Sequence, residues 1–309
     1  MGSDFLILSL APLLVATISS LSCALLGNFL VLRRQSLIGD AISHVALPGI
    51  VASFLITGTL AASAMMLGAG VAALVTMALI EAIKRLGHVE PSAAMGVAFT
   101  AIFALGVLML EVSDASGVHL DVQHALYGNL ESLIWFEGLH WTALLDPAAL
   151  AKLPPQLPRV AWVGLLVAIF VIVAWRPLVI GSFDPAFASS VRARPLLTDI
   201  MLVIMVAITA IAAFEAVGSI LVIAMFICPA ASARLMTDRL LTQIAWSQGF
   251  ACSSAVLGYV LAGYGPGWFG HDVSLSAAGM IATVSGAILL AACLFAPRRH
   301  GNMERMTTD

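Results

Sequence analysis

The sequence predicts an all-α membrane protein, a polytopic bundle of about eight to nine transmembrane helices. Of its 309 residues, 61% are hydrophobic and only 10% are charged, and the mean hydropathy is +1.04. This composition excludes a water-soluble globular domain. Apolar runs of roughly 20 residues recur along the chain, which is the length an α-helix needs to cross about 30 Å of hydrocarbon. A membrane barrel would instead show short segments of alternating hydrophobicity.

The basic residues set the expected spans and their orientation. If the clusters of arginine and lysine share one side, helices are expected at 8–32, 38–57, 60–83, 92–112, 160–178, 197–214, 217–236, 243–264 and 276–296. Only Lys152 and Arg159 then lie on the opposite side. By the positive-inside rule the basic side is cytoplasmic, so the C-terminus is expected inside and the N-terminus outside.

One transmembrane domain is expected to occupy residues 1–309, with two long connections. The outer connection, about 113–158, ends in the proline-rich "KLPPQLPR", which is typical of an extended linker. Its aromatic middle, "LYGNLESLIWFEGLHW", fits a short helix at the membrane interface. The inner connection, about 177–195, mixes small, acidic and basic residues and suits a short helix presented to a cytoplasmic partner.

Asp40 and His44 form the strongest candidate site. Residues four apart share a helix face about 6 Å apart along the axis, so a carboxylate and an imidazole can reach one cation. Zn²⁺, Mn²⁺ and Fe²⁺ accept this mixture of oxygen and nitrogen ligands. Pro48 has no N–H to donate to the carbonyl of His44. In the alternative interpretation, Asp40 caps the helix and His44 makes one interhelical hydrogen bond.

A second group of polar residues falls on the predicted outer side. These residues could form a vestibule that gathers cations, or could be ordinary solvated loop residues, because their spacing matches no closed zinc site. The group consists of His119, Asp121, His124, His140, His271 and Asp272. The sequence contains no G-x-x-x-x-G-K-[ST], H-E-x-x-H or G-x-S-x-G motif, so we predict a transport subunit rather than an enzyme.

Four stretches, in this order, carry a family resemblance: "LGNFLVLRRQSLIGDAISHVALPG", "DVQHALYGNL", "FDPAFA" and "VGSILVIAMFICPAASARL". Together they resemble the permease subunits of bacterial ABC importers for zinc, manganese and ferrous iron. The resemblance implies an inner-membrane permease paired with a second copy or a paralogous permease. It also implies two cytoplasmic ATPase subunits that hydrolyse ATP and an extracytoplasmic solute-binding protein. The divalent ion is then the substrate, with no permanently bound cofactor and no nucleic-acid partner.

The resemblance assigns roles to individual residues. The shared pattern falls on Arg33, Arg34, Ser36 and Gly39, and it makes Asp40 and His44 transient metal ligands on the pathway. The ATPase-coupling segment falls on Phe183, Asp184, Pro185, Ala186, Phe187, Ala188 and Arg192. A packed helix near the pathway falls on Gly218, Pro229, Ala230 and Ala231. The long segment after "LYGNL" and the run "GYGPGWFGHDVSL" depart from the family pattern.

Two other functions stay open at this stage. An ATP-independent secondary transporter or channel could use Asp40 as a cation relay, although the sequence shows no inverted repeat with paired broken helices. A permease for chelated metal, such as a siderophore complex, would be favoured by a wide pathway without a metal-binding pair. One carboxylate and one imidazole do not select among Zn²⁺, Mn²⁺ and Fe²⁺.

Overall fold

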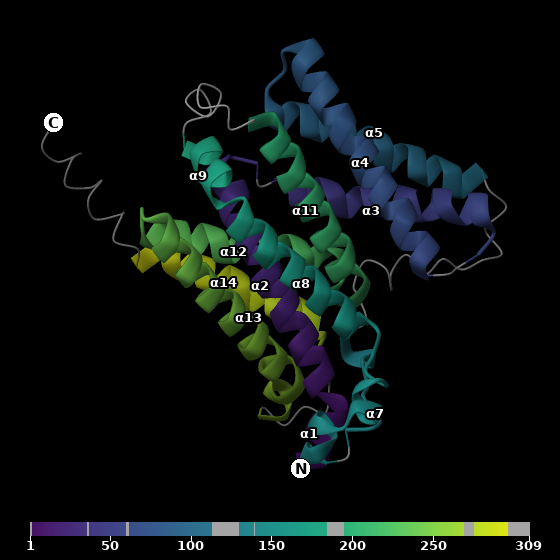
Figure 1. Cartoon of the computed structure of the whole chain (residues 1–309), viewed down its shortest axis with the longest axis vertical. Coiled ribbons are helices and arrows are strands. Elements are labelled where there is room, and N and C mark those ends of the chain that lie inside the picture. The colour runs from purple at the N-terminus through teal and green to yellow at the C-terminus, as the bar shows by residue number, and fades with distance from the viewer. Residues whose placement is uncertain are drawn as a thin grey trace, which may run out of the picture.

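The computed structural model describes residues 2–35, 37–59, 62–112, 130–138, 140–183, 195–268 and 275–295, and these are helical or irregular, with no strand among them (Figure 1). The α-helices are α1 (Gly2–Leu8), α2 (Leu10–Leu32), α3 (Leu37–Thr57), α4 (Ala62–Gly87), α5 (Pro91–Val112), α7 (Pro147–Leu150), α8 (Gln156–Val173), α9 (Trp175–Phe183), α11 (Pro195–Val217), α12 (Ser219–Met236), α13 (Leu240–Trp268) and α14 (Ala277–Phe295). Two short 3₁₀ helices, η2 (Leu130–Ser132) and η3 (Trp141–Leu145), lie in the outer connection.

The predicted helical-bundle fold is confirmed. Within the described ranges, seven helices are long and apolar enough to cross a membrane, namely α2, α4, α5, α8, α11, α13 and α14. Two shorter apolar helices, Pro48–Thr57 in α3 and Leu221–Met236 in α12, coincide with two further expected spans. The expected helix at 160–178 is divided between α8 and α9. The division follows from Pro177, which has no N–H to donate to the carbonyl of Val173.

The helices form two groups that share one hydrophobic core. Figure 1 shows α2, α8, α12, α13 and α14 as one bundle, with α3, α4 and α5 beside it and α11 between the two groups. α11 contacts α2 and α8 on one side and α3 and α4 on the other. Buried side chains of both groups, such as Phe29 of α2, Ile42 of α3 and Phe226 of α12, belong to the same cluster. A movement of one helix group relative to the other would therefore displace α11.

Glycines allow the closest helix contacts. A Cβ atom at Gly27 of α2 would lie 2.0 Å from the carbonyl oxygen of Phe226 in α12. In the second group, a Cβ at Gly49 of α3 would lie 2.4 Å from the oxygen of Gly68 in α4. Membrane helices associate through such backbone approaches, because lipid supplies no hydrophobic drive between them.

A buried polar chain joins α2 to α13. The Nδ2 of Asn28 donates to the Oγ of Ser247 at 2.7 Å, and its Oδ1 accepts from the Nε2 of Gln243 at 3.0 Å. All three side chains are fully buried. Because each finds a partner, the bundle avoids the cost of unsatisfied polar groups in a low-dielectric interior.

The described part of the outer connection does not form the single interfacial helix that we expected. Trp135 is instead fully buried, with its indole N–H donating to the carbonyl of Ala149 at 3.1 Å. Its backbone N–H donates to the carbonyl of Ile7 at the end of α1. Glu131 accepts a 2.6 Å hydrogen bond from the amide of Ala277, at the first turn of α14. These contacts anchor the segment to α1 and α14, and it forms two short 3₁₀ helices in place of one α-helix.

Gly218, between α11 and α12, has φ 86° and ψ 160°, a region that is essentially restricted to glycine. We expect Gly218→Ala to lower the free energy of unfolding by about 1–3 kcal/mol, because a Cβ strains this backbone. Thermal unfolding of the detergent-purified protein measures the effect. Gly286→Ala in α14, where no atom lies within 4 Å of the added Cβ, is the control and should leave the unfolding temperature unchanged or raised. A native unfolding temperature for Gly218→Ala would show that this backbone conformation tolerates a Cβ.

Candidate functional site

The structure places Asp40 and His44 one helical turn apart in α3, as the spacing predicted. The backbone of Asp40 is part of this helix, but its side chain lies outside the described residues. α3 packs against the bundle through Ile38 and Ile42, which are nearly fully buried. Gly39 faces the ring of Phe226, where an added Cβ would lie 3.3 Å from Cδ2. The candidate pair therefore sits on a helix that packs mainly against α4 and α5 and touches α12 through the ring of Phe226.

His44 lies at the contact between α3 and α5. Its ring stacks on Phe99, with centroids 5.7 Å apart and an interplanar angle of 19°. Phe103 approaches the same imidazole edge-on, at 5.9 Å and 79°. The side chain is nevertheless exposed in the single chain. The two phenyl rings thus fix the plane of an imidazole that is still accessible in the single chain.

Pro48 lies inside α3, one turn after His44. Since proline has no N–H, the carbonyl of His44 lacks its usual helical donor. α5 approaches α3 at this point, because a Cβ on Gly106 would lie 2.5 Å from the Cγ of Pro48. The imidazole and the carbonyl oxygen of His44 are two potential ligand atoms close together on one helix.

The outer polar group is largely outside the described residues. This applies to His119, Asp121, His124, His271 and Asp272. His140 is described, and it is exposed just before η3. Among the residues that the structure describes, no group of three or more His, Cys, Asp or Glu side chains is placed to hold a metal ion. The outer vestibule therefore stays a prediction.

The predicted coupling residues Asp184, Pro185, Ala186, Phe187, Ala188 and Arg192 also lie outside the described residues. Phe183 is described as the last residue of α9, with its side chain exposed. The predicted packing residues are all described. Gly218 precedes α12, Pro229 lies inside it, Ala230 is fully buried near Gly27, and Ala231 is half-buried.

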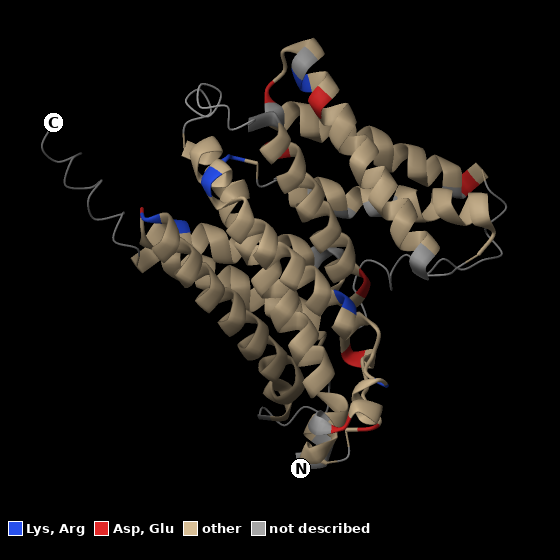
Figure 2. Ribbon diagram, viewed as in Figure 1, with Lys and Arg blue, Asp and Glu red and all other residues tan. Residues whose placement is uncertain are grey.

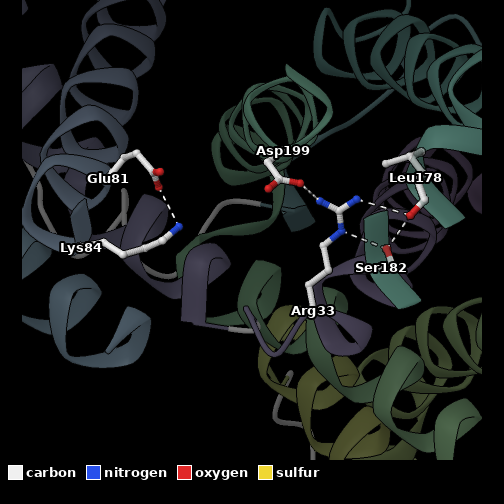
Figure 3. A network of polar contacts seen from close by, with 6 residues as sticks. All are labelled: Arg33, Glu81, Lys84, Leu178, Ser182 and Asp199. Atoms are coloured by element: carbon white, nitrogen blue, oxygen red, sulfur yellow. Dashed lines mark hydrogen bonds and ion pairs between the residues drawn. The ribbon is translucent and has the colours of Figure 1, made fainter. Parts of the chain in front are cut away.

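Arg33 forms a network that we did not predict from the sequence (Figure 3). Its Nε donates to the Oγ of Ser182 at 2.9 Å and its Nη2 to the carbonyl of Leu178 at 3.4 Å, both in α9. Its Nη1 forms an ion pair with Asp199 of α11. Burial lowers the pKa of Arg33 and Asp199 opposes this effect, so the guanidinium stays charged. The sequence offered one sign of this network, because an acid such as Asp199 near the start of an apolar helix needs a basic partner.

A cavity of about 550 Å³ opens between the start of α3, α4 and α11. Its walls are mostly apolar, with Glu81 of α4 and Asp199 of α11 among the lining residues. Figure 3 shows these two carboxylates apart from each other, each beside a base: Glu81 with Lys84 at 2.9 Å, and Asp199 with Arg33. The cavity therefore borders the helix that carries Asp40 and His44.

The family follows from a comparison of the whole chain with known proteins. The model of the ABC 3 transport family matches residues 7–137 and 149–296. The chain belongs to this family. The family resemblance found in the four sequence stretches is thereby confirmed.

Two proteins with similar sequences are named for metal transport. The manganese transport system membrane protein MntD of Bacillus subtilis is 36% identical over 287 residues, covering 93% of this chain and 92% of that protein. The zinc transport system membrane protein TroD of Treponema pallidum is 35% identical over 298 residues, covering 96% and 76%. The solved structure of PsaBC from Streptococcus pneumoniae in complex with Fab superimposes with a TM-score of 0.72 at 26% identity, covering 94% of this chain and 92% of that one.

Proposed function

We propose that this chain is the permease subunit of an ATP-driven importer of a divalent metal ion, Zn²⁺ or Mn²⁺, with Fe²⁺ as a third candidate. The observation that carries the proposal is the placement of Asp40 and His44 one turn apart on α3 in an ABC 3 family chain. Relatives named for manganese and for zinc transport support the substrate class. The metal is cargo, and the chain itself performs no covalent chemistry.

The pair suits passage rather than storage. One carboxylate and one imidazole, with the His44 carbonyl nearby, offer fewer ligands than the four of a closed zinc site. An ion bound by an incomplete set can leave again, which transport requires. ATP binding by partner subunits would bias two arrangements of the permease, one open on each side. The two helix groups on either side of α11 are the units that such a change would move.

The charge distribution supports a cytoplasmic C-terminus. Figure 2 shows most of the lysines and arginines at the end of the molecule opposite α1. The two cations expected outside are neutralised locally: Lys152 pairs with Glu137 at 2.6 Å, and Arg159 pairs with Glu215. The hydrogen bond from Lys152 to Glu137 raises the pKa of that lysine. The remaining positive excess falls on the proposed cytoplasmic side, as the positive-inside rule requires.

The proposed partners follow from these two sides. ATPase subunits would dock on the segment from Phe183 to Arg192, and an extracytoplasmic solute-binding protein would deliver metal at the opposite face. A second copy of the chain or a paralogous permease would complete the transporter, as the resemblance implies.

Metal uptake into proteoliposomes tests the function. Vesicles should contain this chain with its ATPase and should receive the solute-binding protein loaded with Zn²⁺, Mn²⁺ or Fe²⁺. We expect uptake only with MgATP, and none with an ATPase variant that binds but does not hydrolyse ATP. Uptake without ATP that follows an imposed proton or sodium gradient would instead establish a secondary transporter.

A further inference from the structure

Backbone hydrogen bonds link the end of α2 to the start of α3. The amide of Gln35 donates to the carbonyl of Leu30 at 2.8 Å, and the amide of Arg34 donates to that of Val31 at 3.2 Å. Arg34 has φ 56°, so the pattern is a Schellman ending with a left-handed residue in the position that glycine usually takes. The amide of Ile38 then donates to the carbonyl of Gln35 as α3 begins. A displacement of the end of α2 is therefore passed directly to α3.

Arg33 lies at this turn and holds two other helices. Only 6% of its side chain is exposed, whereas 46% of the Asp199 side chain is. The guanidinium fork reaches α9 through Ser182 and Leu178, and reaches α11 through Asp199. Gly181 makes room, because a Cβ there would lie 3.3 Å from the Nη2 of Arg33. A buried charge with three fixed partners tolerates little change in their relative positions.

α9 and α11 are consecutive helices in the described structure, and the predicted ATPase-coupling segment connects them. Both helices that flank this segment thus contact the Arg33 side chain, and Arg33 is the C-cap residue of α2, the helix that leads into α3. No other charged residue in the described part of the chain is shown to bridge α9 and α11. Arg33 is therefore placed to join the proposed ATPase-binding end to the metal pair.

We propose that Arg33 is a positioning residue that couples movement of α9 and α11 to α3, and so links ATP hydrolysis by the partner to movement of the metal past Asp40 and His44. The inference rests on the proposed function. Asp199 takes part because it is the anionic partner of Arg33 and also lines the cavity beside α3. Lysine in place of Arg33 would keep the charge but lose the planar fork that reaches both helices at once.

The test is the number of metal ions imported per ATP hydrolysed, measured in proteoliposomes that hold equal amounts of intact complex. For Arg33→Gln we expect an assembled complex that hydrolyses ATP but imports at least about tenfold less metal per ATP, a size typical of lost coupling between sites. Arg33→Lys should restore part of the number of metal ions imported per ATP hydrolysed. Arg176→Gln is the matched control, because Arg176 is exposed on α9 and its removal deletes the same charge without removing a contact of Arg33, so the ions imported per ATP should stay native.

Single-partner variants separate coupling from folding. If Arg33→Gln prevents assembly, Ser182→Ala and Asp199→Asn each remove one contact and should still lower the ratio. A native ratio in these two variants, or in Arg33→Gln itself, would overturn the inference and leave Arg33 as a structural residue. Absence of ATP-dependent uptake by the native complex would instead overturn the proposed function, so the two failures are distinguishable.

Discussion

Replacing either Asp40 or His44 with alanine is expected to lower metal uptake sharply while leaving the assembled complex intact. Each change removes one of the two proposed ligand groups, which lie one turn apart on α3. An interaction with a charged partner is worth about 1.5–3 kcal/mol, so the initial rate should fall at least about tenfold. Uptake of Zn²⁺, Mn²⁺ and Fe²⁺ from the loaded solute-binding protein, normalised to complex recovered by size exclusion, measures the effect.

The aromatic surroundings of His44 provide a sharper variant than alanine. His44→Phe keeps a flat ring against Phe99 and Phe103 but removes both nitrogen atoms. We expect this variant to assemble as well as the native chain and to lose uptake. Asp40→Asn similarly keeps the size of the side chain while removing its charge. If His44→Phe transports at the native rate, the imidazole only packs between the helices and the ion must pass elsewhere.

The ion preference of the native protein and of these variants can be compared in the same assay. A carboxylate and an imidazole together suit several divalent ions, so selectivity is expected to depend on the geometry around the pair. Phe99 and Phe103 set that geometry for His44. Phe103→Leu, which leaves both proposed ligands in place, should therefore alter the relative uptake of Zn²⁺ and Mn²⁺ more than it alters assembly.

The sequence was sufficient to predict the membrane-spanning helices, because a membrane span is defined by length and apolar composition alone. It was equally sufficient for the shared helix of Asp40 and His44, since their spacing depends only on local geometry. It could not show that Phe99 lies against His44, or that Asp199 pairs with Arg33 across 166 positions of the chain. Those contacts depend on which helices are neighbours, and in a uniformly apolar chain hydropathy does not distinguish one neighbour from another.

The structure differs from the sequence-based expectation in two other places, the division between α8 and α9 at Ala174 and the burial of Trp135. The signal for the first was present locally in Pro177, but a proline can bend a membrane helix as well as end it. The second depends on partners at both ends of the chain, because Trp135 is held near Ile7 and Glu131 caps α14. An aromatic segment suits the membrane interface or a protein interior equally well, and only the tertiary contacts decide between them.

Gly27→Ala is expected to have the largest effect on stability in the bundle. Its Cβ would lie 2.0 Å from the carbonyl oxygen of Phe226 and 3.0 Å from the carbonyl carbon. Because these are backbone atoms, no side-chain rotation relieves the clash, and α2 and α12 must separate. Overpacking typically costs about 1–3 kcal/mol, and we expect the upper part of that range or more. The unfolding temperature and the yield of folded protein in detergent measure the loss. Gly249→Ala in α13, with no atom within 4 Å, is the control.

Gly39→Ala meets the same Phe226 from α3, but in a different way. The added Cβ would lie 3.3 Å from Cδ2 of the ring, which can turn by the few tenths of an ångström required. We therefore expect Gly39→Ala to assemble almost normally while displacing α3, and so to reduce metal uptake more than stability. Since α12 contacts α2 through a backbone oxygen and α3 through a ring, the first contact fixes the bundle and the second can adjust. Equal losses of stability in the two variants would show that α3 is held as rigidly as α2 and cannot move independently against α12.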